Sequence, residues 1–170
     1  MHIASRSVLY GLLLVVGVVL LSGCEGQGDP PDVAAGRFTA HVDGTLSDTL
    51  SGDAHYRMDD GAIVGVELGA EEGPGLSIEL EPQPPELRTY EVVEAEIFGM
   101  ERTGSPPGVL AFLRLKEITF EATDGSFELT YVNEEQIGAT FTFQMEGTYV
   151  EGPSDDASVE VTGELNAPPR

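Results

Sequence analysis

The chain of 170 residues has no tryptophan, one cysteine and eight basic residues. A single cysteine excludes an internal disulfide. The chain has thirty acidic residues against these eight basic ones, which gives a formal net charge of −22. An acidic excess of this size repels nucleic acid and anionic lipid headgroups. We therefore expect no nucleic-acid partner.

Motifs that carry catalysis are also missing. A hydrolase needs a nucleophile, a base and an oxyanion site, yet the chain has no G-x-S-x-G motif, and Lys116 is its one lysine. We expect His41 and His55 on neighbouring strands of a hairpin that turns near Leu46, with His41 opposite about Ser51. This register separates the two histidines by roughly 13 Å at 3.3 Å per residue, too far to share a metal. The sequence therefore predicts a non-enzymatic protein with no catalytic residue, no metal site and no cofactor.

Acidic turns leave one alternative to that prediction. Asp59-Asp60, Asp124 and Asp155-Asp156 would offer the oxygen ligands that calcium prefers. None of them fits a D-x-D-x-D-G loop, and acidic turns are expected at this net charge. Calcium binding at these turns stays open, as does a pair of carboxylates for glycoside hydrolysis, although no pair stands out.

The N-terminus has the order of a secretory signal peptide. Arg6 precedes an almost unbroken apolar run from Val8 to Leu21, and the small residues Ser22 and Gly23 follow it. As a helix this run would rise about 21 Å, against a hydrocarbon core of roughly 30 Å. It is therefore too short for a comfortable permanent span, and we expect it to be removed.

The residues Leu21-Ser22-Gly23-Cys24 resemble the lipobox of bacterial lipoproteins. In that family the cysteine thiol carries a diacylglycerol, the signal peptidase cuts just before it, and the new amino group is usually acylated. The resemblance implies that Leu21, Ser22 and Gly23 are the peptidase recognition residues and that Cys24 is the lipidation site. Glu25 in place of aspartate favours the outer membrane. The alternative is a chance cysteine behind an ordinary signal peptide.

The predicted cleavage divides the chain into three parts: a lipoprotein signal peptide over 1–23, a flexible linker over 24–35 and a β-domain over 36–167. The mature protein would keep 170 − 23 = 147 residues, enough for one domain with a real core. Its charge would be 7 − 30 = −23, because Arg6 leaves with the signal peptide. We hypothesise a halophilic source in which salt screens this charge. An acidic surface without such a role is the alternative.

From Arg37 onward the hydrophobic pattern has period two, which is typical of half-buried strands. The sequence predicts an all-β fold, an antiparallel meander of about nine strands that forms a β-sandwich. The alternative is a closed up-and-down β-barrel. We expect the strands at 38–44 (FTAHVDG) and 159–167 (VEVTGELNA) to pair with each other. The segment 94–102 is ambiguous and is predicted as irregular or a single helical turn.

Local patterns give sharper expectations. Asp124-Gly125 is a two-residue hairpin signal, and it predicts a turn between two strands. Alternation places Met58 in the core and Glu81 on the outer face. It also predicts Ala62, Val64, Val66 and Leu68 on one face of a strand and Ile63, Gly65 and Glu67 on the other. The longest alternation predicts Ile137, Ala139, Phe141, Phe143 and Met145 on the inner face of one strand. Gly147 breaks the phase of this strand, where a bulge is expected.

The strand layout is similar to that of small, β-rich, uncharacterised lipoproteins of Bacteroidota-type bacteria, whose F-x-A-x-V-x-G-like and V-T-G-x-x-N-A-like strands bracket a meander. This resemblance implies architecture and no chemistry. We therefore expect a lipid-anchored cell-envelope protein, held in the membrane by acyl chains on Cys24, that acts as a structural or binding module for an unknown envelope protein or small ligand. The alternative is a lipocalin-like carrier with Tyr56, Val66, Phe141 and Phe143 around a cavity, although the G-x-W motif of lipocalins is absent.

Overall fold

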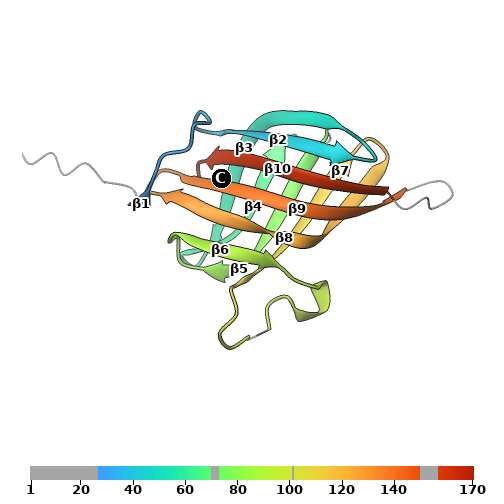
Figure 1. Cartoon of the computed structure of the whole chain (residues 1–170). Helices are drawn as coiled ribbons and strands as arrows, with labels where there is room; N and C mark the ends of the chain where they lie inside the picture. The colour runs from blue at the N-terminus through green and yellow to red at the C-terminus, as the bar shows by residue number, and fades with distance from the viewer. Residues whose placement is uncertain (1–26, 70–72, 101, 150–156) are drawn as a thin grey trace, which may run out of the picture.

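The computed structural model describes residues 27–69, 73–100, 102–149 and 157–170, which form one ten-stranded sheet (Figure 1). Among these residues no helix is long and apolar enough to cross a membrane. One short 3₁₀ turn, η1 (Ala95–Ile97), lies in the segment predicted as irregular or a single helical turn. The strands are β1 (Gln27–Gly28), β2 (Arg37–Gly44), β3 (Asp48–Asp59), β4 (Ala62–Gly69), β5 (Gly75–Gln83), β6 (Arg88–Val92), β7 (Gly108–Leu115), β8 (Ile118–Val132), β9 (Ile137–Tyr149) and β10 (Ala157–Ala167).

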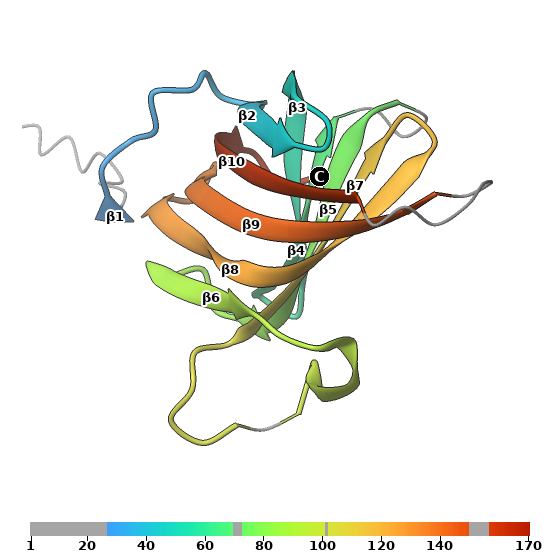
Figure 2. The same ribbon diagram turned by 45° about the vertical axis from the view of Figure 1, so that its right-hand side comes forward.

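The hydrogen bonds of the sheet run round in a ring. Antiparallel ladders join each strand to the next in the order β2, β3, β4, β5, β7, β8, β9 and β10. A last antiparallel ladder joins β10 to β2. The short strand β6 is inserted into this ring, antiparallel to β8 and parallel to β7 (Figure 2). The all-β antiparallel meander is confirmed. It is a single sheet curved around one core rather than a regular barrel.

The predicted pairing of the first long strand with the last is confirmed. Eight residue pairs join β2 to β10, from Val159 opposite Gly44 to Asn166 opposite Arg37. This ladder closes the ring and leaves neither strand with an open edge, since β3 and β9 cover their other sides. Exposed edges invite pairing with other chains, so the closure protects the domain from edge-to-edge association.

The hairpin predicted at Asp124-Gly125 is wrong, because β8 runs unbroken through both residues. Asp124 Oδ1 accepts a hydrogen bond from the Gly125 amide at 2.7 Å, and the ladder with β9 shifts register between Ala122 and Asp124. Gly125 has a φ of 121°, and a Cβ there would lie 2.1 Å from the Thr142 carbonyl oxygen. The local signal therefore marks a bulge that bends a long strand, which the equally long β9 pairs on both sides of the bend.

A second bulge explains two errors in the predicted faces. The ladder between β4 and β5 shifts register between Ile63 and Gly65. As a result Ile63 is fully buried, whereas Ala62 and Val64 are only half-buried. On the other side of the same ladder, Glu81 is buried rather than exposed. Alternation cannot be read across a bulge, since an extra residue moves the following side chains to the opposite face.

Two other local expectations also fail. Met58, predicted in the core, is 44% exposed at the end of β3, beside a register shift between Arg57 and Met58. Gly147 carries no bulge, because the ladder of β9 with β8 continues through it in register and the ladder with β10 ends at it without a shift. A Cβ at Gly147 would lie 2.6 Å from the Phe120 ring. Glycine is therefore present there to leave room for that ring.

The interior of the ring is filled by one hydrophobic cluster to which every long strand contributes. The inward residues of β9 were predicted as a group, and all are buried: Ile137, Ala139, Phe141, Phe143 and Met145. Phe141 and Phe143 stack with ring centroids 5.7 Å apart. Tyr90 is fully buried, and burial raises the pKa of its hydroxyl to about 12, with the Arg88 charge opposing that rise. Burial on this scale provides the main stabilisation of the fold.

The described part of the predicted flexible linker lies against the domain. Gln27 and Gly28 form β1, which pairs with Val132 and Tyr131 of β8. Further along, the Val33 carbonyl accepts a hydrogen bond from the Asn166 side chain at 3.1 Å. These contacts hold parts of 27–35 next to the domain, and residues 24–26 lie outside the described part of the chain.

Candidate functional site

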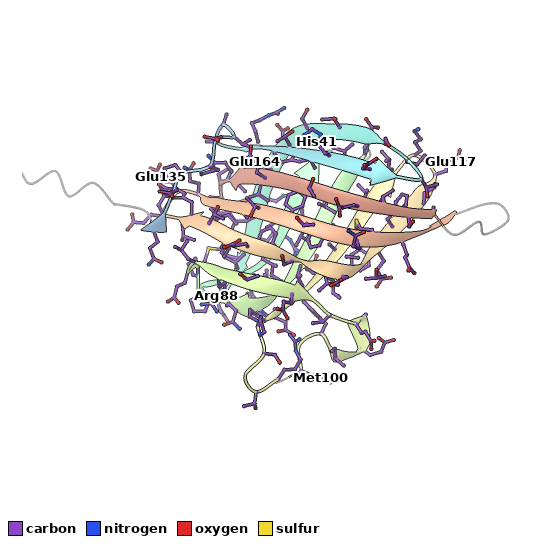
Figure 3. The ribbon with its side chains drawn as sticks, viewed as in Figure 1. His41, Arg88, Met100, Glu117, Glu135 and Glu164 are labelled. Carbon is purple, nitrogen blue, oxygen red and sulfur yellow. The ribbon has the colours of Figure 1, made fainter. Side chains whose placement is uncertain are left out.

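A groove of about 1550 Å³ lies beside the segment that joins β6 to β7. We call it the loop groove. Figure 3 shows this connecting loop, which carries Met100, projecting from the sheet. One wall is the end of β6 with the loop, and the other is formed by β7 to β10 near their ends. Its lining residues are Glu91–Ile97, Arg102, Ser105, Phe112, Thr119, Glu121–Thr123, Glu146, Gly147, Ala157 and Ser158.

The loop wall is held by one buried carboxylate, that of Glu81 on β5. Glu81 Oε2 accepts hydrogen bonds from the Gly108 amide at 2.6 Å and from Arg102 Nη2 at 2.9 Å. Glu81 Oε1 accepts a third from the Gly99 amide at 2.9 Å. Arg102 Nη2 also donates to the Pro106 carbonyl at 3.2 Å. One side chain thus ties three points of the loop together, and we call this arrangement the Glu81 clasp.

Close packing around the clasp explains the glycine where β7 begins. A Cβ at Gly108 would lie 2.8 Å from a methyl group of Val93 and 2.9 Å from both Glu81 Oε1 and Arg102 Nη2. Contacts below 3 Å are not tolerated there, since Val93 is buried and the ion pair is fixed by its other bonds. Glycine at 108 therefore allows the backbone amide to approach the carboxylate.

The clasp lowers the pKa of Glu81. Burial on its own raises that pKa, but the hydrogen bonds from the Gly108 and Gly99 amides and the hydrogen bond and charge of Arg102 outweigh it. Hydrogen bonds to the ionised form favour that form. The carboxylate is therefore charged at neutral pH, and its protonation would weaken all three bonds at once.

The loop groove is strongly acidic. Among the described residues of its lining five have carboxylates, namely Glu91, Glu94, Glu96, Glu121 and Glu146. Two of them, on β8 and β9, lie directly opposite each other in the ladder. Like charges in this position repel, at a cost of about 0.2–1 kcal/mol. Arg102 is the one basic residue among the described residues of the lining, and it forms an ion pair with Glu81.

A second, smaller hollow of about 380 Å³ adjoins the groove. Both hollows share Phe112 and Thr119, so they lie side by side on the outer face of β7 and β8. Its basic residues are Arg114, which donates to the Gly73 carbonyl at 3.1 Å, and Arg170, which pairs with Glu67. The half-buried Phe112 ring separates an acidic hollow from one that contains two guanidinium groups.

The site residues predicted from the sequence lie elsewhere. Leu21, Ser22, Gly23 and Cys24 are outside the described residues, so their roles in processing and lipidation stay predictions. The pairing of His41 with Thr49, rather than with Ser51, places His55 six residues further along β3, roughly 20 Å away. Among the described residues no group of three or more histidine, cysteine or carboxylate side chains is arranged to hold a metal ion.

Sequence reasoning missed both the groove and its clasp. The groove combines an irregular loop with residues of four strands that lie as far along the chain as Ser158, 158 − 91 = 67 positions after Glu91. The one available signal was Glu81-Pro82, an acidic residue followed by a proline at the end of a clean alternation. Comparison of the chain with protein-family models, with curated proteins and with solved structures finds no match.

Proposed function

We propose that this protein is a lipid-anchored binding module of the bacterial cell envelope, without enzymatic activity, and that the loop groove is its binding site. The observation that carries the proposal is the Glu81 clasp. A carboxylate that is 9% exposed and accepts three hydrogen bonds holds the loop in place before any ligand arrives. Preorganisation of this kind lowers the entropic cost of binding.

The anchor half of the proposal rests on the N-terminal sequence. The apolar run, the small residues and the cysteine occur in the order that lipoproteins require. One acyl chain gives only marginal membrane affinity, whereas two or more give stable attachment. A mature Cys24 that carries a diacylglycerol and an N-acyl chain would therefore keep the domain on a membrane, with the outer membrane favoured by Glu25.

A surface groove is better supported than an interior ligand. The four residues that a lipocalin-like carrier would use, Tyr56, Val66, Phe141 and Phe143, belong to the hydrophobic cluster and are at most 4% exposed. None of them lines either hollow described above. A carrier would need these side chains to surround free volume, and here they contact one another and their neighbours.

The intact mass of the protein extracted from membranes tests the anchor. We expect a chain that begins at Cys24 and exceeds the mass of residues 24–170 by a diacylglyceryl group and an acyl chain. Cys24→Ala should abolish incorporation of a fatty-acid probe and leave the circular-dichroism spectrum of the domain unchanged. Continued labelling of the Cys24→Ala protein would refute acylation at this residue.

A further inference from the structure

We propose that β1 fixes the orientation of the domain on the membrane, with the β1 end of the sheet against the lipid headgroups and the β7–β8 turn pointing away. This inference rests on the proposed anchor at Cys24. The chain before the described residues ends next to β1, and only Glu25 and Gly26 separate Cys24 from Gln27.

Chain length sets how far the domain can stand from its anchor. An extended chain spans at most about 3.6 Å per residue, so the three steps from Cys24 to Gln27 reach no more than roughly 11 Å. The acylated cysteine has to stay at the membrane surface. Gln27 and the strand end that it pairs with must therefore lie about one headgroup layer from the bilayer.

The attachment of the tether continues beyond β1. The Pro31 ring packs on Gly138, where a Cβ would lie 2.9 Å from its ring carbons. The Asn166 side-chain amide donates a hydrogen bond to the Val33 carbonyl at 3.1 Å, and the Gly36 amide donates one to the Asn166 carbonyl at 2.7 Å. Residues 27–36 thus contact β8, β9 and β10 in turn, so a pull on Cys24 acts on the whole end of the sheet.

The orientation follows from the register of β8. Its last residue, Val132, pairs with β1, whereas its first, Ile118, pairs with Leu115 across the β7–β8 turn. Figure 3 labels Glu135 beside β1 and Glu117 at the opposite end of the sheet. The thirteen residues of β9, which run between these ends, span roughly 40 Å at 3.3 Å per residue. Since Glu121, Glu146 and Ser158 lie near the far end, the loop groove would face away from the membrane.

Energy transfer to the bilayer tests this orientation. Because the thiol of the chain's only cysteine would be bound to lipid, an introduced cysteine is the sole site for a thiol-reactive dye. Glu135→Cys and Glu117→Cys are matched, since both remove one exposed carboxylate from a turn. The processed, acylated proteins are placed in phosphatidylcholine vesicles that carry an acceptor dye on the headgroup. We expect at least threefold higher transfer efficiency from position 135 than from position 117.

Two further variants separate β1 from the anchor. Gly28 has a φ of 84°, and a Cβ there would lie 1.9 Å from the Thr130 carbonyl oxygen, so Gly28→Ala should detach β1. Gly36→Ala is the control, since Gly36 has a φ of 75° but a Cβ there would lie 3.9 Å from the Pro168 ring, an ordinary contact. An insertion of twelve Gly and Ser residues between Glu25 and Gly26 lengthens the tether and leaves the domain unchanged.

The ratio of the two transfer efficiencies should fall towards one in Gly28→Ala and in the insertion variant, and should persist in Gly36→Ala. An acylated, vesicle-bound protein with a ratio near one would overturn the orientation alone. A ratio that the insertion leaves unchanged would overturn the role of the short tether. A protein without acyl chains that does not bind vesicles would overturn the proposed anchor and this inference together.

Discussion

Replacement of Glu81 by alanine should destabilise the domain by about 3 kcal/mol, because it leaves Arg102 and the Gly99 and Gly108 amides without their shared acceptor. The loss should appear first in the loop that walls the groove. We expect a lower urea midpoint and faster hydrogen exchange at Gly99 and Gly108. The stability of Glu81→Gln should lie between that of the wild type and that of Glu81→Ala, since an amide can still accept hydrogen bonds through its oxygen.

Glu79→Ala provides the matched control for this prediction. Glu79 precedes Glu81 by two residues on β5 and pairs with Arg57 at 2.6 Å, but its side chain is 40% exposed. Exposed ion pairs contribute about 0–1 kcal/mol, so this change should have a small effect. Equal losses of stability in Glu79→Ala and Glu81→Ala would contradict the special role of the clasp.

The pH dependence of the clasp has a defined sign. The pKa of Glu81 is lower in the folded state than its ordinary value of 4.5. Its contribution to stability is therefore complete above pH 4.5 and is lost as the pH falls through the folded pKa. The difference in unfolding free energy between the wild type and Glu81→Gln should shrink as the pH is lowered below 4.5. A difference that grows on acidification would refute this assignment.

Raising NaCl from 0.1 M to 1 M should increase the melting temperature by at least about 5 °C, because the screening length falls from roughly 10 Å to 3 Å. The net charge of −22 makes the folded state repel itself, and two ladders set acidic residues directly opposite each other, Glu121 with Glu146 and Asp43 with Glu160. Salt should relieve this repulsion. The proposal of a halophilic source depends on this outcome.

A variant in which two opposed carboxylates are replaced by neutral amides makes the salt prediction specific. Glu121→Gln combined with Glu146→Gln removes one of the opposed pairs, so its melting temperature should be higher at 0.1 M NaCl and should change less with salt. Glu134→Gln with Glu135→Gln removes the same charge from an exposed turn and serves as the control. A melting curve that stays flat or falls with salt in the wild type would contradict the screening account.

Alternation predicted the strands well wherever a strand carries no bulge of its own. The five inward residues of β9 and the pairing of β2 with β10 follow from period-two patterns, since one face of each strand is buried. Asp59-Asp60-Gly61 was also predicted correctly as a turn, and Asp60 and Gly61 there both have positive φ. These features depend on local chemistry and on a face that the core defines.

The errors arise where the ring of strands imposes curvature. Asp124-Gly125 satisfies the local rules for a hairpin, but a β9 of matching length pairs with β8 on both sides of it and turns the signal into a bulge. The face of Glu81 was predicted wrongly because the register of the β4–β5 ladder shifts at this point, where residues 80–82 of β5 stand opposite Val64 alone. Both outcomes depend on how the partner strand pairs and not on the local residues alone.

Site-specific photocrosslinking in intact cell envelopes tests the claim of a binding groove most directly. A photoreactive side chain is introduced at Ile97, which lines the groove, and at Thr142, an exposed control on the outer face of β9. We predict one defined adduct from position 97, none from position 142, and loss of the adduct when Glu81→Ala is added. The same adducts from both positions, or an adduct at position 97 that survives loss of the clasp, would contradict the claim that the loop groove is a binding site.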